Sequence, residues 1–163
     1  MQFSEQEKEL YIDYMLNNGE LELLLKKWKR KKGDSNLVID IIKMLACRDT
    51  QLGGLILSVT ANSVPKGADY VQFYIPELYP DVTLNNVLGK DNQKYVMAFT
   101  SKERFQVCND TSGLVMFIGD VFQIVEKKNE VQGIVLNWNK EEMVIGKDMI
   151  RAVLYGIEEL GNG

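Results

Sequence analysis

Histidine is absent from this chain of 163 residues. Without an imidazole, the chain lacks the usual general acid and base of neutral pH and the partner of Ser–His and Cys–His nucleophiles. It also lacks the commonest nitrogen ligand of zinc and iron. We therefore predict no catalytic residue, no metal site and no cofactor. Any enzymatic activity would depend on carboxylate, lysine, tyrosine, serine or cysteine side chains.

Cysteine is scarce, and its two positions indicate free thiols. Cys47 and Cys108 lie far apart in the sequence and form no CxxC motif. In a reducing compartment such residues are most simply free, buried thiols. Cys108 is expected near the carboxyl end of a helix, where the helix dipole disfavours a thiolate. For this reason we do not predict that Cys108 is a nucleophile.

Long apolar runs are missing as well. No segment reaches the ~18 consecutive apolar residues of a membrane-spanning helix, and residues 1–7 lack the basic and apolar regions of a signal peptide. The hydrophobic fraction of 45% and the charged fraction of 26% are those of an ordinary globular domain. We predict a single cytoplasmic domain over residues 1–163 that makes no membrane contact.

Positive charge is concentrated in one run, although the net charge is -4. Residues 26–32 are all Lys or Arg except Trp28, a composition found in nucleic-acid and acidic-membrane patches. At about 100° per residue, however, Trp28 shares a helical stripe with Leu21 and Leu25, so the cations spread over the opposite, solvated side. This interpretation and the negative net charge disfavour a nucleic-acid partner. The sequence leaves open whether the run has a function.

Three amphipathic helices are predicted in residues 1–48. Ser4 and Glu7 have the spacing of a capping box at the start of the first helix. The second helix covers residues 20–32, and Gly33 ends it in the left-handed conformation. The third helix extends to about Cys47. These helices form a lead-in to the rest of the chain.

The remaining chain alternates strands and helices. Thr100 with Glu103, and Asp120 with Gln123, have the spacing of helix caps. Strands joined by helices of about ten residues demand parallel neighbours, whereas short turns predict antiparallel hairpins over 82–99 and 133–145. The expected fold is α/β with α+β character, a mixed sheet over residues 50–157 with a parallel βαβαβ core in the C-terminal half. Strands are predicted at 55–60, 70–75, 82–88, 95–99, 114–118, 133–137 and 143–145, and helices at 101–109, after Asp120, and at 149–157.

Two landmarks resemble a known family. Residues 95–101 read YVMAFTS, and residues 133–137 read GIVLN before a short apolar run at 143–145. Over residues 37–157 this order resembles the N-terminal domain of the SseB family, bacterial proteins linked to enhanced serine sensitivity, whose landmarks read approximately "pvFTS" and "GIVlNP". Trp138 departs from the pattern, because the family usually has Pro there. The resemblance implies a small bacterial cytoplasmic α/β domain with no established catalytic residues.

Four residues at strand ends form the candidate binding surface: Thr100, Ser101, Asn137 and Trp138. They are expected at the carboxyl edge of the sheet, where ligands of open α/β sheets bind. Trp138 in a turn is a candidate partner contact or a residue packed over the sheet end. We predict a non-enzymatic accessory or regulatory protein that acts by protein–protein contact, with homo-oligomerisation left open. The alternative is a small-anion or metabolite site, or a histidine-free enzyme, at the helix N-terminus formed by Thr100 and Ser101.

Overall fold

The computed structural model describes residues 4–162, with only the backbone of Asn162. Within this range the chain forms six α-helices, two short 3-10 helices and eight strands. The helices are α1 (Glu5–Met15), α2 (Gly19–Arg30), α3 (Ser35–Thr50), α4 (Lys102–Phe105), α5 (Ile118–Lys127) and α6 (Lys147–Asn162), with 3-10 helices η1 (Ala68–Tyr70) and η2 (Gln106–Cys108). The strands are β1 (Gly54–Thr60), β2 (Gln72–Phe73), β3 (Thr83–Leu84), β4 (Asn86–Leu88), β5 (Lys94–Phe99), β6 (Ser112–Phe117), β7 (Gly133–Leu136) and β8 (Met143–Gly146).

All eight strands join one mixed sheet, which confirms the predicted α/β class. The strand order is β2-β6-β1-β5-β7-β8, with β3 paired to β1 and β4 paired to β5. The β5–β7 and β2–β6 pairs are parallel. Both predicted hairpins are present, because β4–β5 and β7–β8 pair antiparallel.

The prediction about parallel neighbours is only partly right. Strands β5 and β6 run in the same direction, but β1 lies between them and pairs antiparallel with both. Ile56 of β1 is opposite Phe99 on one side and Val115 on the other. Strand β1 precedes the alternating segment in sequence, so nothing in the local pattern of residues 95–118 indicates that it is inserted there.

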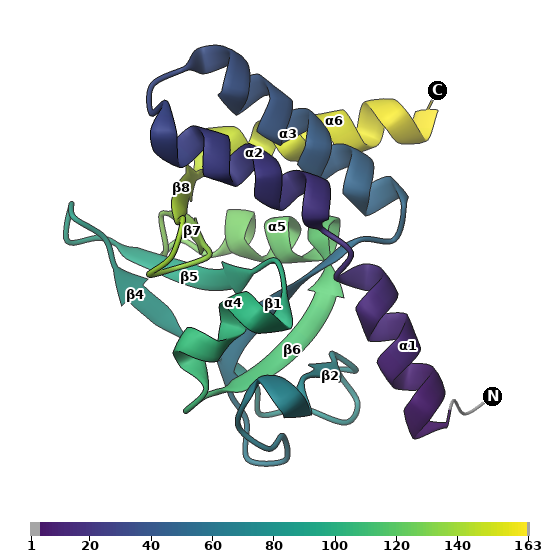
Figure 1. The fold of residues 1–163 in the computed structure, drawn as a ribbon. Coiled ribbons are helices and arrows are strands. Elements are labelled where there is room, and N and C mark those ends of the chain that lie inside the picture. Colours follow the sequence, from purple (N-terminus) through teal and green to yellow (C-terminus); the bar gives the residue numbers. More distant parts are fainter. Residues whose placement is uncertain (1–3, 163) are drawn as a thin grey trace.

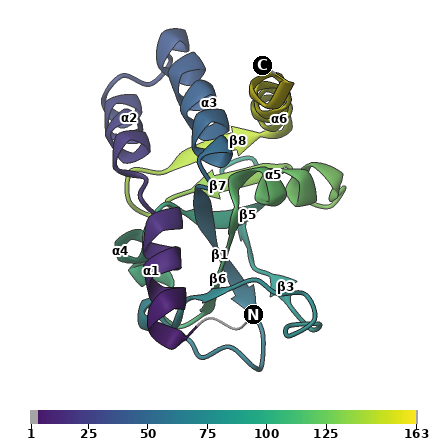
Figure 2. The same cartoon turned by 90° about the vertical axis from the view of Figure 1, so that its right-hand side faces the viewer.

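The central strands of the sheet are buried on both faces. Alternate side chains of β1 point to opposite sides, so Leu55 and Leu57 join one apolar core and Ile56 joins the other. Helices α2, α3, α5 and α6 contribute to the first core, and α1, α4 and η1 contribute to the second. Figures 1 and 2 show α2, α3 and α6 together beyond one side of the sheet, with α1 and α4 away from them.

Two predicted strands are shorter than expected. The segment predicted as a strand at 70–75 forms η1 followed by the two-residue strand β2, and Pro76, which has no backbone N–H to donate, follows closely. The segment predicted at 82–88 is divided into β3 and β4. The chain changes partner at Asn85, whose side-chain amide donates to Ser58 Oγ (3.0 Å) and accepts from Thr60 Oγ1 (2.8 Å).

One of the three predicted helix caps is confirmed. Ser4 and Glu7 form the full capping box of α1. The cap at Thr100 is wrong, because Ser101 Oγ accepts from Arg104 N (3.1 Å) and α4 starts one residue later. The cap at Asp120 is also wrong, because α5 begins at Ile118. Asp49, from the end of α3, accepts the hydrogen bond of Gly119 N instead (2.7 Å), and burial raises the pKa of that carboxyl.

The lengths of the helices bear on the membrane prediction. Within residues 4–162, no helix combines the length and the apolar character that crossing a membrane requires.

Candidate functional site

Two of the four predicted site residues, Thr100 and Asn137, are hydrogen bonded to each other in the protein interior. Thr100 N donates to Asn137 Oδ1 (3.0 Å), and Asn137 Nδ2 donates to Thr100 Oγ1 (3.0 Å). Their exposed fractions are 0% and 1%. The prediction that they lie at one edge of the sheet is therefore confirmed by their contact. Because both side chains are buried, their role is to hold two strand ends together.

The same network fastens the N-terminal helices to the sheet. Asn18 Nδ2 donates to the carbonyls of Thr100 (2.9 Å) and Gly54 (3.0 Å). Arg48, which is 9% exposed, donates to Asn18 Oδ1 (3.1 Å) and to the carbonyl of Met15 at the end of α1 (3.1 Å). Sequence reasoning missed Asn18 and Arg48, because Asn18 has the signal of a helix stop and Arg48 that of a surface cation.

The third predicted residue, Ser101, acts as a helix cap. Helix α4 has four residues, and the Ser101 hydroxyl accepts a hydrogen bond from Arg104 N in its first turn. Ser101 thereby fixes the first turn of the helix that carries Arg104.

Arg104 connects three separate segments. Its guanidinium is 8% exposed, and Nη2 donates to Glu141 Oε2 at 2.7 Å. Nε lies 3.5 Å from Glu22 Oε2 on α2, and Nη1 is buried with no hydrogen-bond partner among the described residues. Replacement of this arginine is expected to be destabilising, because it would leave the two partly buried carboxylates without a counter-charge.

The fourth predicted residue, Trp138, lies in a loop held at both ends. This loop, residues 137–142, is called the Trp138 loop below. Asn137, Asn139 and Glu141 all have positive φ, at 58°, 73° and 56°. Asparagine tolerates this conformation, but glutamate rarely adopts it. The hydrogen bonds of Asn137 and the ion pair of Glu141 hold the loop, and backbone strain of this kind concentrates at functional sites.

The Trp138 loop forms one wall of a surface cleft of about 730 Å³, called the tryptophan cleft below. The other walls come from the end of α2, the β4–β5 hairpin and β8, segments that lie along the left side of Figure 1. Both tryptophans of the chain, Trp28 and Trp138, line it. Each is half-buried, and they pack against the two different cores. The helical stripe predicts that Trp28 points into the core. In the structure Trp28 packs against the core and also lines the cleft.

The tryptophan cleft has an excess of available positive charge. Its lysines are exposed, and none of them forms an ion pair within residues 4–162. Of its three carboxylates, only Glu141 is paired with a cation, Arg104; Glu142 is exposed and forms no ion pair within residues 4–162, and Asp91 accepts hydrogen bonds from the neutral Tyr95 Oη (2.8 Å) and Gln93 N (3.0 Å). Both bonds lower the pKa of Asp91. The charged residues that line the cleft are Lys29, Lys32, Lys90, Lys140, Asp91, Glu141 and Glu142.

The two cysteines differ in exposure. Both are free, with Cys47 partly exposed and Cys108 buried. Burial and the nearby Asp110 raise the pKa of Cys108 to about 11, so only about one thiol in a thousand is ionised at pH 8. Within the described residues, no group of three or more Cys, Asp and Glu side chains is placed to hold a metal ion.

These differences predict an order of alkylation. In folded protein at pH 8, iodoacetamide is expected to modify Cys47 and to leave Cys108 unmodified over the same period, because a buried thiol is neither ionised nor accessible. Peptide mapping by mass spectrometry distinguishes the two sites, and both should react in urea. Faster modification of Cys108 than of Cys47 in the folded protein would contradict this assignment.

Comparison of the chain with family models, curated proteins and solved structures found no match.

Proposed function

We propose that this chain is a non-enzymatic accessory or regulatory domain that binds an acidic segment of a protein partner in the tryptophan cleft. The observation that carries the proposal is the charge state of the cleft. Its four lysines lack ion-pair partners within residues 4–162, and because Arg104 neutralises Glu141, only the carboxylates of Asp91 and Glu142 oppose them. An acidic partner supplies the missing counter-charges.

The two tryptophans support a binding role. Half-buried rings fixed against a core offer a large contact area and lose little conformational entropy when a partner binds. Trp138 also belongs to a loop whose ends are fixed by Asn137 and Glu141, so less ordering is required on association. Exposed lysines at the rim increase the rate of encounter with an acidic partner.

The alternative function has less support. A small-anion or metabolite site, or a histidine-free enzyme, at Thr100 and Ser101 requires free donors at a helix N-terminus. Thr100 is buried, and the Ser101 hydroxyl already accepts from Arg104 N. Partner binding also agrees with the resemblance to the SseB family, which implies no established catalytic residues. Membership of that family stays a prediction.

The proposal predicts which peptides the cleft selects. A displayed library of random twelve-residue peptides should yield acidic sequences, and tryptophan fluorescence gives their affinity directly, because Trp28 and Trp138 are the only tryptophans in the chain. Trp138→Ala should weaken binding by about 30-fold, the ~2 kcal/mol of a typical hot spot. Its affinity can be followed through the remaining Trp28.

A matched pair of variants controls for net charge. Lys29 near the end of α2 and Lys32 just after the helix line the cleft, whereas Lys26 and Lys27 are exposed on α2 without lining it. We expect Lys29→Ala/Lys32→Ala to weaken peptide binding at least tenfold and Lys26→Ala/Lys27→Ala to change it less than twofold. Equal losses in both variants would indicate non-specific attraction. If the wild-type protein bound an oligothymidine strand at least as tightly as the selected acidic peptides, nucleic acid would be favoured over a protein partner.

A further inference from the structure

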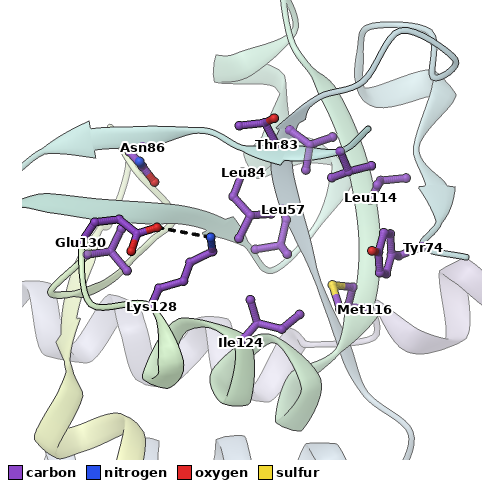
Figure 3. A pocket seen from close by; sticks show the side chains of 13 residues that line it. Leu57, Tyr74, Thr83, Leu84, Asn86, Leu114, Met116, Ile124, Lys128 and Glu130 are labelled. Atoms are coloured by element: carbon purple, nitrogen blue, oxygen red, sulfur yellow. Dashed lines mark hydrogen bonds and ion pairs between the residues drawn. The ribbon is translucent and has the colours of Figure 1, made fainter. Parts of the chain in front are cut away.

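A second cavity, of about 390 Å³, shares no lining residue with the tryptophan cleft. Leu57 of β1 and Leu114 of β6 form part of its floor, and Ile124 of α5 forms a wall. Figure 3 shows these side chains around the cavity, with β3 and β4 along its other side. Its volume falls within the roughly 300–1,000 Å³ of small-molecule sites.

Polar groups surround this apolar interior. Figure 3 shows Lys128 extending toward Glu130, with their ion pair marked, and Asn86 nearby. The Lys128 Nζ–Glu130 Oε1 distance is 3.5 Å, and the two side chains are 37% and 60% exposed. A long, exposed pair of this kind contributes little to stability and exchanges partners readily. Lys128 is therefore available to a second carboxylate that arrives with an apolar body.

We propose that this cavity, called the Lys128 pocket, binds a small amphipathic monocarboxylate, with its hydrocarbon part against the partly exposed Leu84, Met116 and Ile124 and its carboxylate on Lys128. Burial of the hydrocarbon part provides most of the affinity, since binding strengthens about fourfold for each methylene group removed from water. The ammonium group selects an anion over a neutral compound of the same shape, because a hydrogen bond between two charged groups is stronger than one between neutral groups.

Two substitutions at the pocket mouth should have opposite effects. Lys128→Met removes the cation and should weaken the binding of octanoate and decanoate about tenfold. Glu130→Gln frees Lys128 from its partner and removes a competing negative charge, so it should strengthen binding of the same acids several-fold. Octanol and decanol lack the charge, so their affinities should change less than twofold in both variants. Isothermal titration calorimetry below the micelle concentration measures all these affinities.

The site itself is checked independently. The neighbouring Lys127 is exposed and does not line this pocket, so Lys127→Met should leave acid binding unchanged. Val82→Trp, which places a larger side chain in the pocket wall, should abolish the binding of acids and alcohols together. In NMR spectra, decanoate should shift the methyl signals of Leu84 and Ile124. Undetectable binding, equal responses of Lys127→Met and Lys128→Met, or shifts confined to other regions would overturn the proposal. None of these results bears on peptide binding in the tryptophan cleft.

Discussion

Replacement of Arg104 by methionine is expected to lower the free energy of unfolding by about 3 kcal/mol. The arginine is 8% exposed, and its partners Glu22 and Glu141 are 23% and 18% exposed. Methionine fills much of the space but leaves both carboxylates partly buried without a counter-charge. Because the carboxylates retain some contact with water, the expected loss is at the lower end of the range for buried pairs.

Urea unfolding of a small set of variants measures this effect. Arg104→Met/Glu141→Gln should recover part of the stability that Arg104→Met loses, because one unpaired charge is removed together with the cation. Lys102→Met is the matched control on α4: the Lys102–Asp13 pair spans 3.5 Å, and its side chains are 35% and 64% exposed, so the loss should stay below about 1 kcal/mol. Similar losses for the two single variants would show that Arg104 is not a structural centre.

The local sequence predicts most elements of this fold. Apolar stripes with a helical period and capping signals place α1, α2, α3 and α6, and apolar or β-branched runs of strand length place β1, β5 and β7. The predictions that fail depend on contacts between distant segments. Asn85 divides a predicted strand because Ser58 and Thr60 bind its side chain, and Asp49 replaces Asp120 at the start of α5.

The sequence predicts that the four candidate residues lie close together, but it does not predict that three of them support a loop. Thr100, Ser101, Asn137 and Trp138 do lie near one another, because the carboxyl ends of parallel strands β5 and β7 share an edge. Three of these residues hold structure and only Trp138 lines the tryptophan cleft. The lysines of the cleft come from α2 and the turn after it, the β4–β5 hairpin and the Trp138 loop, and no pattern within any one segment predicts that they meet.

Replacement of Asn137 by alanine is expected to cost about 3 kcal/mol of stability. About 2 kcal/mol arises because Thr100 N loses its acceptor while remaining buried, and about 1 kcal/mol arises because alanine is disfavoured at a φ of 58°. Asn137→Gly separates the two terms. Glycine accepts positive φ and makes no side-chain hydrogen bond, so it should cost only about 2 kcal/mol.

Asn139→Ala is the control for this comparison, because Asn139 is exposed, has φ of 73° and makes no side-chain hydrogen bond within residues 4–162. It should cost only about 1 kcal/mol, the backbone contribution alone. Acidic peptide binding extends the test to function. If the buried bonds of Asn137 hold the Trp138 loop in its binding conformation, Asn137→Gly should weaken peptide binding at temperatures where the protein stays folded. Unchanged affinity in Asn137→Gly would mean that the loop needs no such anchor, and Trp138 would then bind its partner from a flexible segment.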